Sequence, residues 1–146
     1  MNISITKYGS DILASERFQQ AYGVTHHYKS NVAEHSLHVA GEACRIAGWL
    51  NRHGFSISYE DVVRGSLLHD IGMTDGRVAE CRSWRKAYAH PRRGTDIAGT
   101  EYNENAVVQN TIRRHMWPIC VIPPRHISGW IVVAADKICS IREIAA

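Results

Sequence analysis

Apolar side chains recur along most of the chain at the three- and four-residue intervals that place them on one face of an α-helix. The clearest stripe consists of Val32, Val39, Ala43, Ile46 and Leu50. No segment shows sustained alternation of apolar and polar residues, and no hairpin turn signal is evident. The pattern predicts an all-α fold, a bundle of about six to seven helices. The segments that it favours are residues 10–20, 31–50, 58–72, 77–89, 91–102, 103–115 and 125–146.

Capping residues predict several helix boundaries. Asn31 precedes an apolar-periodic segment and is followed three positions later by Glu34, as in a capping box. Ser58 opens the next helix in the same way. Pro91 suits the first turn of a helix, and Asn103 is a suitable cap for the helix after it. The polar, glycine-containing stretch 21–30 predicts a loop.

Length and composition indicate one domain over residues 1–146, because no repeat, low-complexity tract or composition break divides the chain. The chain has 146 residues, of which 45% are hydrophobic and 21% charged, ordinary values for a globular protein. Its formal net charge of +3 is too small to indicate a nucleic-acid polymer as the partner. The charge does suit a site that receives a small anion.

Targeting signals and cysteine usage bear on the compartment. No secretory signal is visible near residue 1, and the longest purely apolar run, 130–135, is too short to span a bilayer. The four cysteines show no close-pair spacing, so neither a zinc knuckle nor a disulfide framework is expected. We therefore expect a cytoplasmic protein with no membrane partner. A homodimer is one alternative for its assembly.

Histidine and aspartate side chains stand where the pattern predicts a buried face or a helix end. His35 lies within the apolar stripe between Val32 and Val39, where a hydrogen-bonded core histidine is the ordinary interpretation. His69 and Asp70 stand at the end of the third predicted helix, where two neighbouring side chains can converge on one ion. The plain alternative for this pair is a solvated helix terminus.

Asp136 follows the apolar run 130–135 directly. A carboxylate in a helix that is apolar on all sides requires a cation or several hydrogen-bond donors. Lys137 points about 100° away around the helix, so we expect it to be a poor direct partner. A metal ion or a distant arginine would serve instead. His90 and His115 lie at helix ends, where a capping or dipole-stabilising role is the alternative to ligation.

These residues are of the types that bind divalent metals, and separate helices supply them. Three or four nitrogen and oxygen ligands hold one ion in a reactive site, and six can hold a pair. Helical bundles build such sites from inward-facing side chains. We therefore predict one or two divalent ions (Mn, Fe, Mg, Ni or Zn) bound by His35, His69, Asp70, His90, His115 and Asp136.

Several strings resemble the successive motifs of the HD-domain superfamily, namely NVAEHSLHVA (31–40), LLHDIG (67–72) and VVAADKICS (132–140). The intervening AHPRRGTDIA and IRRHMWP are similar to a bacterial subgroup of HD phosphohydrolases of undefined substrate. The resemblance implies a single HD domain with a core of about five helices. It also implies a primary metal on His35, His69, Asp70 and Asp136. A second ion would lie on His90 and His115, with Asp70 as the bridge between the two.

The chain departs from three specialised branches of that superfamily. The mononuclear nucleotidases carry a catalytic glutamate shortly after the HD pair, where this chain has Gly72 and Met73. Cyclic-di-nucleotide phosphodiesterases carry a lysine at the place of Met73 and a GYP-containing motif that is absent here. The acidic pair of alarmone hydrolases is only partly matched, by Asp75. These departures disfavour the specific substrates of all three branches.

The resemblance implies a metal-dependent phosphohydrolase in which metal-activated water attacks the phosphate ester of a small, nucleotide-like anion. We expect Asp70 and Lys137 to be catalytic, and Lys29, His27 and Arg17 to bind the substrate. Further candidates for substrate or anion binding are His26, Arg92 and Arg114.

Two other functions remain open from the sequence. One branch of the superfamily uses the same six ligands to hold mixed-valent iron and activates oxygen, and imidazole-rich sites accept iron readily. The other alternative is a ligand-binding module without catalysis. Phosphate release, oxygen consumption and binding without turnover distinguish the three.

Overall fold

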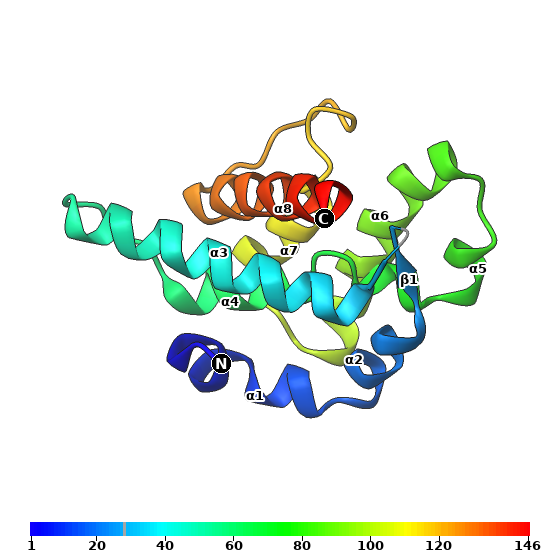
Figure 1. The fold of residues 1–146 in the computed structure, drawn as a ribbon, viewed down its shortest axis with the longest axis horizontal. Coiled ribbons are helices and arrows are strands. Elements are labelled where there is room, and N and C mark those ends of the chain that lie inside the picture. The colour runs from blue at the N-terminus through cyan, green and yellow to red at the C-terminus, as the bar shows by residue number, and fades with distance from the viewer. Residues whose placement is uncertain (28) are drawn as a thin grey trace.

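The computed structural model describes residues 1–27 and 29–146, and the regular structure of this part of the chain is almost entirely helical, as predicted (Figure 1). Its eight α-helices are α1 (Ile3–Ala14), α2 (Glu16–Gln20), α3 (Val32–Arg52), α4 (Tyr59–Leu68), α5 (Gly76–Ala79), α6 (Ser83–Glu101), α7 (Ala106–Arg114) and α8 (Ile127–Ala145). Two 3₁₀ turns, η1 (Ala21–Gly23) and η2 (Ile71–Thr74), and two short strands, β1 (Thr25–His26) and β2 (Ser30–Asn31), complete the described elements.

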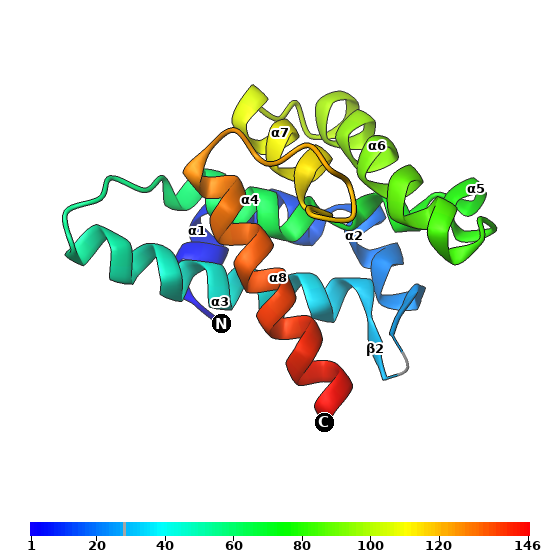
Figure 2. The ribbon, with the colours of Figure 1, turned by 90° about the horizontal axis from the view of Figure 1, so that it is seen from above.

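Helix α4 occupies the centre of the bundle and packs against α1, α3, α7 and α8. Its buried face includes Val63, Leu67 and Leu68, which belong to the main hydrophobic core. Helix α8 crosses α3, as the view from above shows (Figure 2). Helix α6 packs on η2 and α7. The C-terminal end of α4 therefore lies where segments from several parts of the chain meet.

The predicted starts of α3 and α4 are confirmed. The side chain of Asn31 accepts a hydrogen bond from the backbone N–H of Glu34 at 2.9 Å. Ser58 accepts one from the N–H of Asp61 at 3.2 Å. Each cap satisfies an N–H group that has no partner within its helix, typically worth about 1 kcal/mol.

The N-terminal prediction of one helix over residues 10–20 is wrong in its boundaries. Helix α1 begins earlier, where Asn2 caps it by accepting from Ser4 N–H at 2.8 Å. Ser15 then separates two helices. Its hydroxyl donates to the carbonyl of Ile12 at 2.6 Å and accepts from the N–H of Phe18 at 3.2 Å. One serine ends α1 and caps α2, because its short side chain competes for backbone hydrogen bonds on both sides.

Pro91 does not begin a helix but lies inside α6, so the predicted helices 77–89 and 91–102 are replaced by the short α5 and the long α6. Proline cannot donate a backbone hydrogen bond to the carbonyl one turn earlier, which is that of Ala87. The thiol of Cys120 donates to that carbonyl instead, at 3.7 Å. A side chain from a distant loop thus satisfies the group that the proline leaves free, a contact that local sequence patterns do not reveal.

Asn103 does not cap α7, as the sequence had suggested. It has a φ of 51°, in the left-handed region that asparagine tolerates better than most residues and that ends helices. Asn105 is the cap, and its side chain accepts from the N–H of Val108 at 2.9 Å. The cap of α7 therefore lies two residues later than expected, and Asn103 instead follows the end of α6.

The predicted loop 21–30 contains more structure than expected, although residue 28 lies outside the described residues. It holds η1 and the antiparallel pair β1–β2, in which Thr25 faces Asn31 and His26 faces Ser30. His27 has a φ of 48°, a left-handed turn conformation. In the described part of the chain, no helix has both the length and the apolar character required to cross a bilayer.

Candidate metal centre

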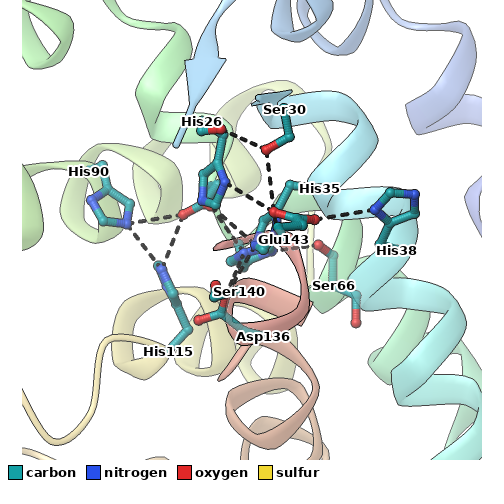
Figure 3. Close-up of polar contacts among 12 residues, drawn as sticks. His26, Ser30, His35, His38, Ser66, His90, His115, Asp136, Ser140 and Glu143 are labelled. Carbon is teal, nitrogen blue, oxygen red and sulfur yellow. Dashed lines mark hydrogen bonds and ion pairs between the residues drawn. The ribbon is translucent and has the colours of Figure 1, made fainter. Parts of the chain in front are cut away.

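The structure brings all six predicted metal-binding side chains together in the interior. Figure 3 labels four of them, His35, His90, His115 and Asp136. Helices α3, α6 and α8 supply one residue each, the ends of α4 and α7 supply the others, and every member is 6% exposed or less. They are His35, His69, Asp70, His90, His115 and Asp136. Sequence positions about one hundred residues apart therefore share one buried site.

One side of the cluster is formed by His35, His69 and Asp136, whose ligand atoms all lie within 4.8 Å of one another. The Nε2 atom of His35 is 3.0 Å from Oδ1 of Asp136. The Nε2 atom of His69 is 3.8 Å from the same oxygen. Asp136 is thus the meeting point of two imidazoles, as its position in an apolar helix had suggested.

The other side of the cluster is formed by His90 and His115. Their Nε2 atoms are 3.0 Å apart. Oδ1 of Asp70 lies 3.1 Å from Nε2 of His90 and 3.3 Å from Nε2 of His115. Its second oxygen, Oδ2, lies 3.1 Å from Nε2 of His69. The two oxygens of this carboxylate therefore face different histidines.

Three histidines are oriented by their own helices. The Nδ1 atoms of His69 and His115 lie 2.7 Å from carbonyl oxygens of the preceding turn, and that of His90 lies 2.6 Å from one. A carbonyl only accepts hydrogen bonds, so each Nδ1 carries the proton. In the neutral ring the Nε2 lone pair then points into the cluster, the arrangement typical of metal-binding histidines.

Glu143, on α8, is a part of the site that the sequence analysis missed. Its carboxylate lies 3.0 Å from Nδ1 of His35 and 3.2 Å from Nδ1 of His38, and accepts from Ser30 Oγ at 3.3 Å. A signal was present, because Ser140 and Glu143 follow Asp136 by one and two helical turns and so share its face. Such a polar stripe in an apolar helix indicates an extended site.

His26 also belongs to the cluster, although the sequence suggested only that its loop could reach a substrate. Its ring stacks on that of His35 with centroids 3.8 Å apart, and its Nε2 lies 3.3 Å from Oδ2 of Asp70. His26, His35 and Asp70 form a further group that could hold an ion. His27 is exposed beside it, with ring centroids 4.2 Å apart. The hairpin β1–β2 produces this difference, because it buries one histidine and leaves the next outside.

The structure places the other predicted side chains around the cluster or away from it. Nζ of Lys137 lies 2.8 Å from Oδ2 of Asp136, so the expectation that this lysine is a poor direct partner was wrong. Its long flexible stem bends back along the helix, which the angle between the two positions does not capture. Lys29 donates to the carbonyl oxygen of Ala146 at 2.7 Å. Arg17 pairs with Glu101. The substrate-binding roles of Lys29, His27 and Arg17 stay predictions.

The electrostatics of the cluster favour ionised carboxylates. Burial raises the pKa of Asp70, but the charge of His69 and the polar contacts of the surrounding histidines outweigh it and hold that pKa well below its ordinary value. Burial likewise opposes ionisation of Asp136, and the hydrogen bond from His35 together with the charge of His69 lowers its pKa. Two buried negative charges are thus available to a cation.

His69 and His115 differ in their electrostatics. Burial lowers the pKa of His69, but the charges of Asp70 and Asp136 outweigh it and raise that pKa to about 9. Burial lowers the pKa of His115 to about 4, so this ring is neutral near pH 7. The carboxylates thus draw a proton onto one imidazole, and a bound cation would compete for the same negative charge.

The donor set fits a divalent metal. Neutral imidazole nitrogens and carboxylate oxygens are ligands that Mn, Fe and Zn accept. The buried Nε2 atom of His69 has no hydrogen-bond partner, although it is surrounded by oxygen atoms at close range. Buried polar atoms of this kind require an explanation. A cation among the ligand atoms supplies one.

Comparison with known proteins agrees with this arrangement. A family model for the HD domain matches residues 32–140, a range that contains all six of the predicted metal-binding residues. His26 and Glu143 lie just outside it. A search of curated proteins found no match. The match covers well over half of the chain, and the chain therefore belongs to the HD domain family.

Proposed function

We propose that this protein is a metal-dependent phosphohydrolase that cleaves the phosphate ester of a small, nucleotide-like anion at a dinuclear metal centre. Members of the HD domain family are typically metal-dependent hydrolases. Divalent ions at such a centre supply Lewis acidity, and they lower the pKa of water into the neutral range. This chain has buried imidazole and carboxylate groups that could hold such ions.

The observation that carries the proposal is the contact between the rings of His90 and His115. Both Nδ1 atoms donate to backbone carbonyls, so in the neutral rings both Nε2 lone pairs face each other at 3.0 Å. Two lone pairs at this distance repel each other unless a cation accepts both. His90 and His115 would therefore hold a divalent ion through these two nitrogens.

Asp70 supports a second ion. Its two oxygens are directed to separate groups of histidines, with His90 and His115 near Oδ1 and His69 near Oδ2. A carboxylate in this position can contribute one oxygen to each of two ions. We assign His35, His69 and Asp136 to one ion, His90 and His115 to the other, and Asp70 to both.

The chain's own groups then divide the remaining tasks. Glu143 accepts the Nδ1 proton of His35 and holds its ring in orientation. Lys137, whose side chain is 40% exposed while it contacts Asp136, carries a positive charge at the rim of the cluster. We expect this charge to attract the phosphoryl oxygens of the substrate. His27, which is exposed beside His26, is a candidate to contact the rest of the substrate.

The test is phosphate release from nucleotides and from p-nitrophenyl phosphate, measured with manganese. Asp70→Ala should abolish release, whereas His53→Ala should retain it, because His53 stacks on Trp49 at the far end of α3. Full activity of the Asp70 variant would contradict the proposal. So would less than one equivalent of metal after supplementation. Oxygen consumption with an iron signal and no phosphate release would favour the oxygenase instead.

A further inference from the structure

A second site lies where α6 and α7 meet the connection between α7 and α8. It is a cavity of about 190 Å³ lined by Tyr88, Pro91, Arg92, Arg113, Arg114, Cys120, Val121 and Ile122. No lining residue of this cavity belongs to the candidate metal centre. Two hydrogen bonds tie the connection between α7 and α8 to α6. The Cys120 thiol in the connection donates to the carbonyl of Ala87 on α6, and the Tyr88 hydroxyl on α6 donates to the carbonyl of Ile119 in the connection.

Three arginines line this cavity, and none of them is held in an ion pair within the described residues. Within the described residues, Arg92, Arg113 and Arg114 form no ion pair and donate no side-chain hydrogen bond. The Nε atom of Arg114 is buried and has no partner. By contrast, Arg93, which is next to Arg92 on α6, pairs with Asp75 at 2.6 Å. A buried guanidinium donor without an acceptor costs free energy, so the cavity is built for an acceptor from outside the chain.

The charges of these arginines act on one another. The positive charges of Arg92 and Arg114 lie close enough to act on that of Arg113, and the negative charge of Asp96 opposes them only in part. Burial raises the pKa of the Cys120 thiol, and the same three guanidinium groups oppose that rise. All three positive charges therefore lie near the Cys120 thiol, which lines the same cavity. Their mutual repulsion would be relieved by an anion among them.

We propose that this cavity binds the phosphate group of a small molecule, at a site separate from the metal centre. Arginine is suited to this ligand, because its planar fork of donors matches phosphate oxygens. Pockets for whole drug-sized ligands begin at about 300 Å³. The smaller cavity here therefore fits a phosphate or phosphomonoester, with the apolar side chains of Val121 and Ile122 beside the organic part.

Calorimetric titration of the full chain with inorganic phosphate tests the site, with and without added manganese. Arg113→Ala should weaken binding roughly 10- to 100-fold, as expected for loss of hydrogen bonds to a charged group. Arg85→Ala, on α6 beside the exposed Trp84 and outside the residues that line the cavity, should leave phosphate binding unchanged. Asp70→Ala should retain the binding seen without manganese, which separates this site from the metal centre whether or not the protein hydrolyses phosphate esters.

Thermal unfolding distinguishes an anion site from arginines that only hold the fold together. Arg113→Met should raise the melting temperature of the phosphate-free protein, because it removes repulsion, and should abolish the rise caused by phosphate. A lower melting temperature together with unchanged phosphate binding would overturn the proposal. So would phosphate binding that requires manganese and is lost in Asp70→Ala. If a single-stranded oligonucleotide binds more tightly than inorganic phosphate and displaces it, the cavity belongs to a nucleic-acid site and the proposal is wrong.

Discussion

Gly72 lies against the backbone of His90 so closely that a Cβ atom at position 72 would fall 2.1 Å from the carbonyl oxygen of His90. The same atom would fall 2.7 Å from the backbone nitrogen of Gly94. Backbone atoms cannot move aside as a flexible side chain does. Gly72 follows His69 by three positions and Asp70 by two. The absence of a side chain at Gly72 therefore allows α6 to approach these two residues closely, and this approach sets the position of His90 in the cluster.

Gly72→Ala should separate α6 from η2 and displace His90 from Asp70. We expect a loss of about 1–3 kcal/mol in unfolding free energy, the usual range for overpacking, and a lower affinity for one of two metal ions. Urea denaturation and metal analysis provide the measurements. Gly41→Ala is the control, because nothing lies within 4 Å of its added Cβ. This helical alanine should stabilise by about 0.5–1 kcal/mol. Equal effects of the two substitutions would contradict the packing argument.

His115→Ala tests the number of ions. The variant removes a ligand from the pair with His90 but leaves His35, His69 and Asp136 unchanged, so bound manganese should fall from about two to about one per chain. His53→Ala should keep the full amount. Metal analysis after gel filtration gives the counts, and circular dichroism verifies folding. If both variants and the native protein bind a single ion, the centre is mononuclear.

The sequence predicted which histidines and aspartates are buried together, because chemistry and periodicity coincide there. Asp136 stands in an apolar helix and His35 in an apolar stripe, and both are buried as expected. Motif resemblance added the pairing of His90 with His115, which spacing alone could not supply. The caps at Asn31 and Ser58 were predictable for a related reason, since their partners lie within one helical turn.

The features that the sequence did not predict depend on contacts between distant segments. Pro91 continues a helix because Cys120 satisfies the carbonyl that the proline leaves without a donor. His26 enters the cluster because a two-residue strand pair turns it inward. Lys137 reaches Asp136 through side-chain flexibility. In each case the local pattern is ambiguous and tertiary packing decides the outcome.

Glu143→Gln should weaken metal binding without unfolding the protein. The carboxylate accepts from Nδ1 of His35 and thereby increases the electron density of the ligand nitrogen, and such partners typically contribute 10- to 100-fold to metal affinity, as an order-of-magnitude estimate. Competition with a fluorescent chelator measures this affinity. Glu60→Gln, at an exposed position in the first turn of α4, is the control. Unchanged affinity in the Glu143 variant would show that His35 is oriented by other contacts.

Arg64 should be much more important for stability than its partner Asp11. The guanidinium bonds the exposed carboxylate of Asp11 at 2.7 Å and the buried carboxylate of Glu104 at 2.6 Å. Arg64→Ala leaves the second charge buried without a partner, which costs about 3–5 kcal/mol. Asp11→Ala removes only a solvated group, with a cost below about 1 kcal/mol. Urea unfolding of the two variants tests the difference, and similar losses would contradict it.

The reactivity of the four cysteines should depend on burial. Burial raises the pKa of both Cys44 and Cys139 to about 11. A thiol stays neutral below its pKa, so at pH 8 roughly one in a thousand of these groups is the reactive thiolate. Cys81 and Cys120 are only partly buried. Cys120 also has a raised pKa, through burial that nearby arginines only partly offset, and should react less readily than an exposed thiol.

Titration of the native protein with Ellman's reagent at pH 8 should therefore show two accessible thiols, Cys81 and Cys120, and two that react only after denaturation in guanidinium. Cys81→Ser should remove the first kinetic phase, and Cys120→Ser the second. Cys120 lines the same cavity as the three arginines. Phosphate bound among the arginines should therefore shield the Cys120 thiol and slow its kinetic phase alone. Rapid reaction of all four thiols in the native protein would show that α3 and α8 separate readily, since Cys44 and Cys139 are buried on those helices.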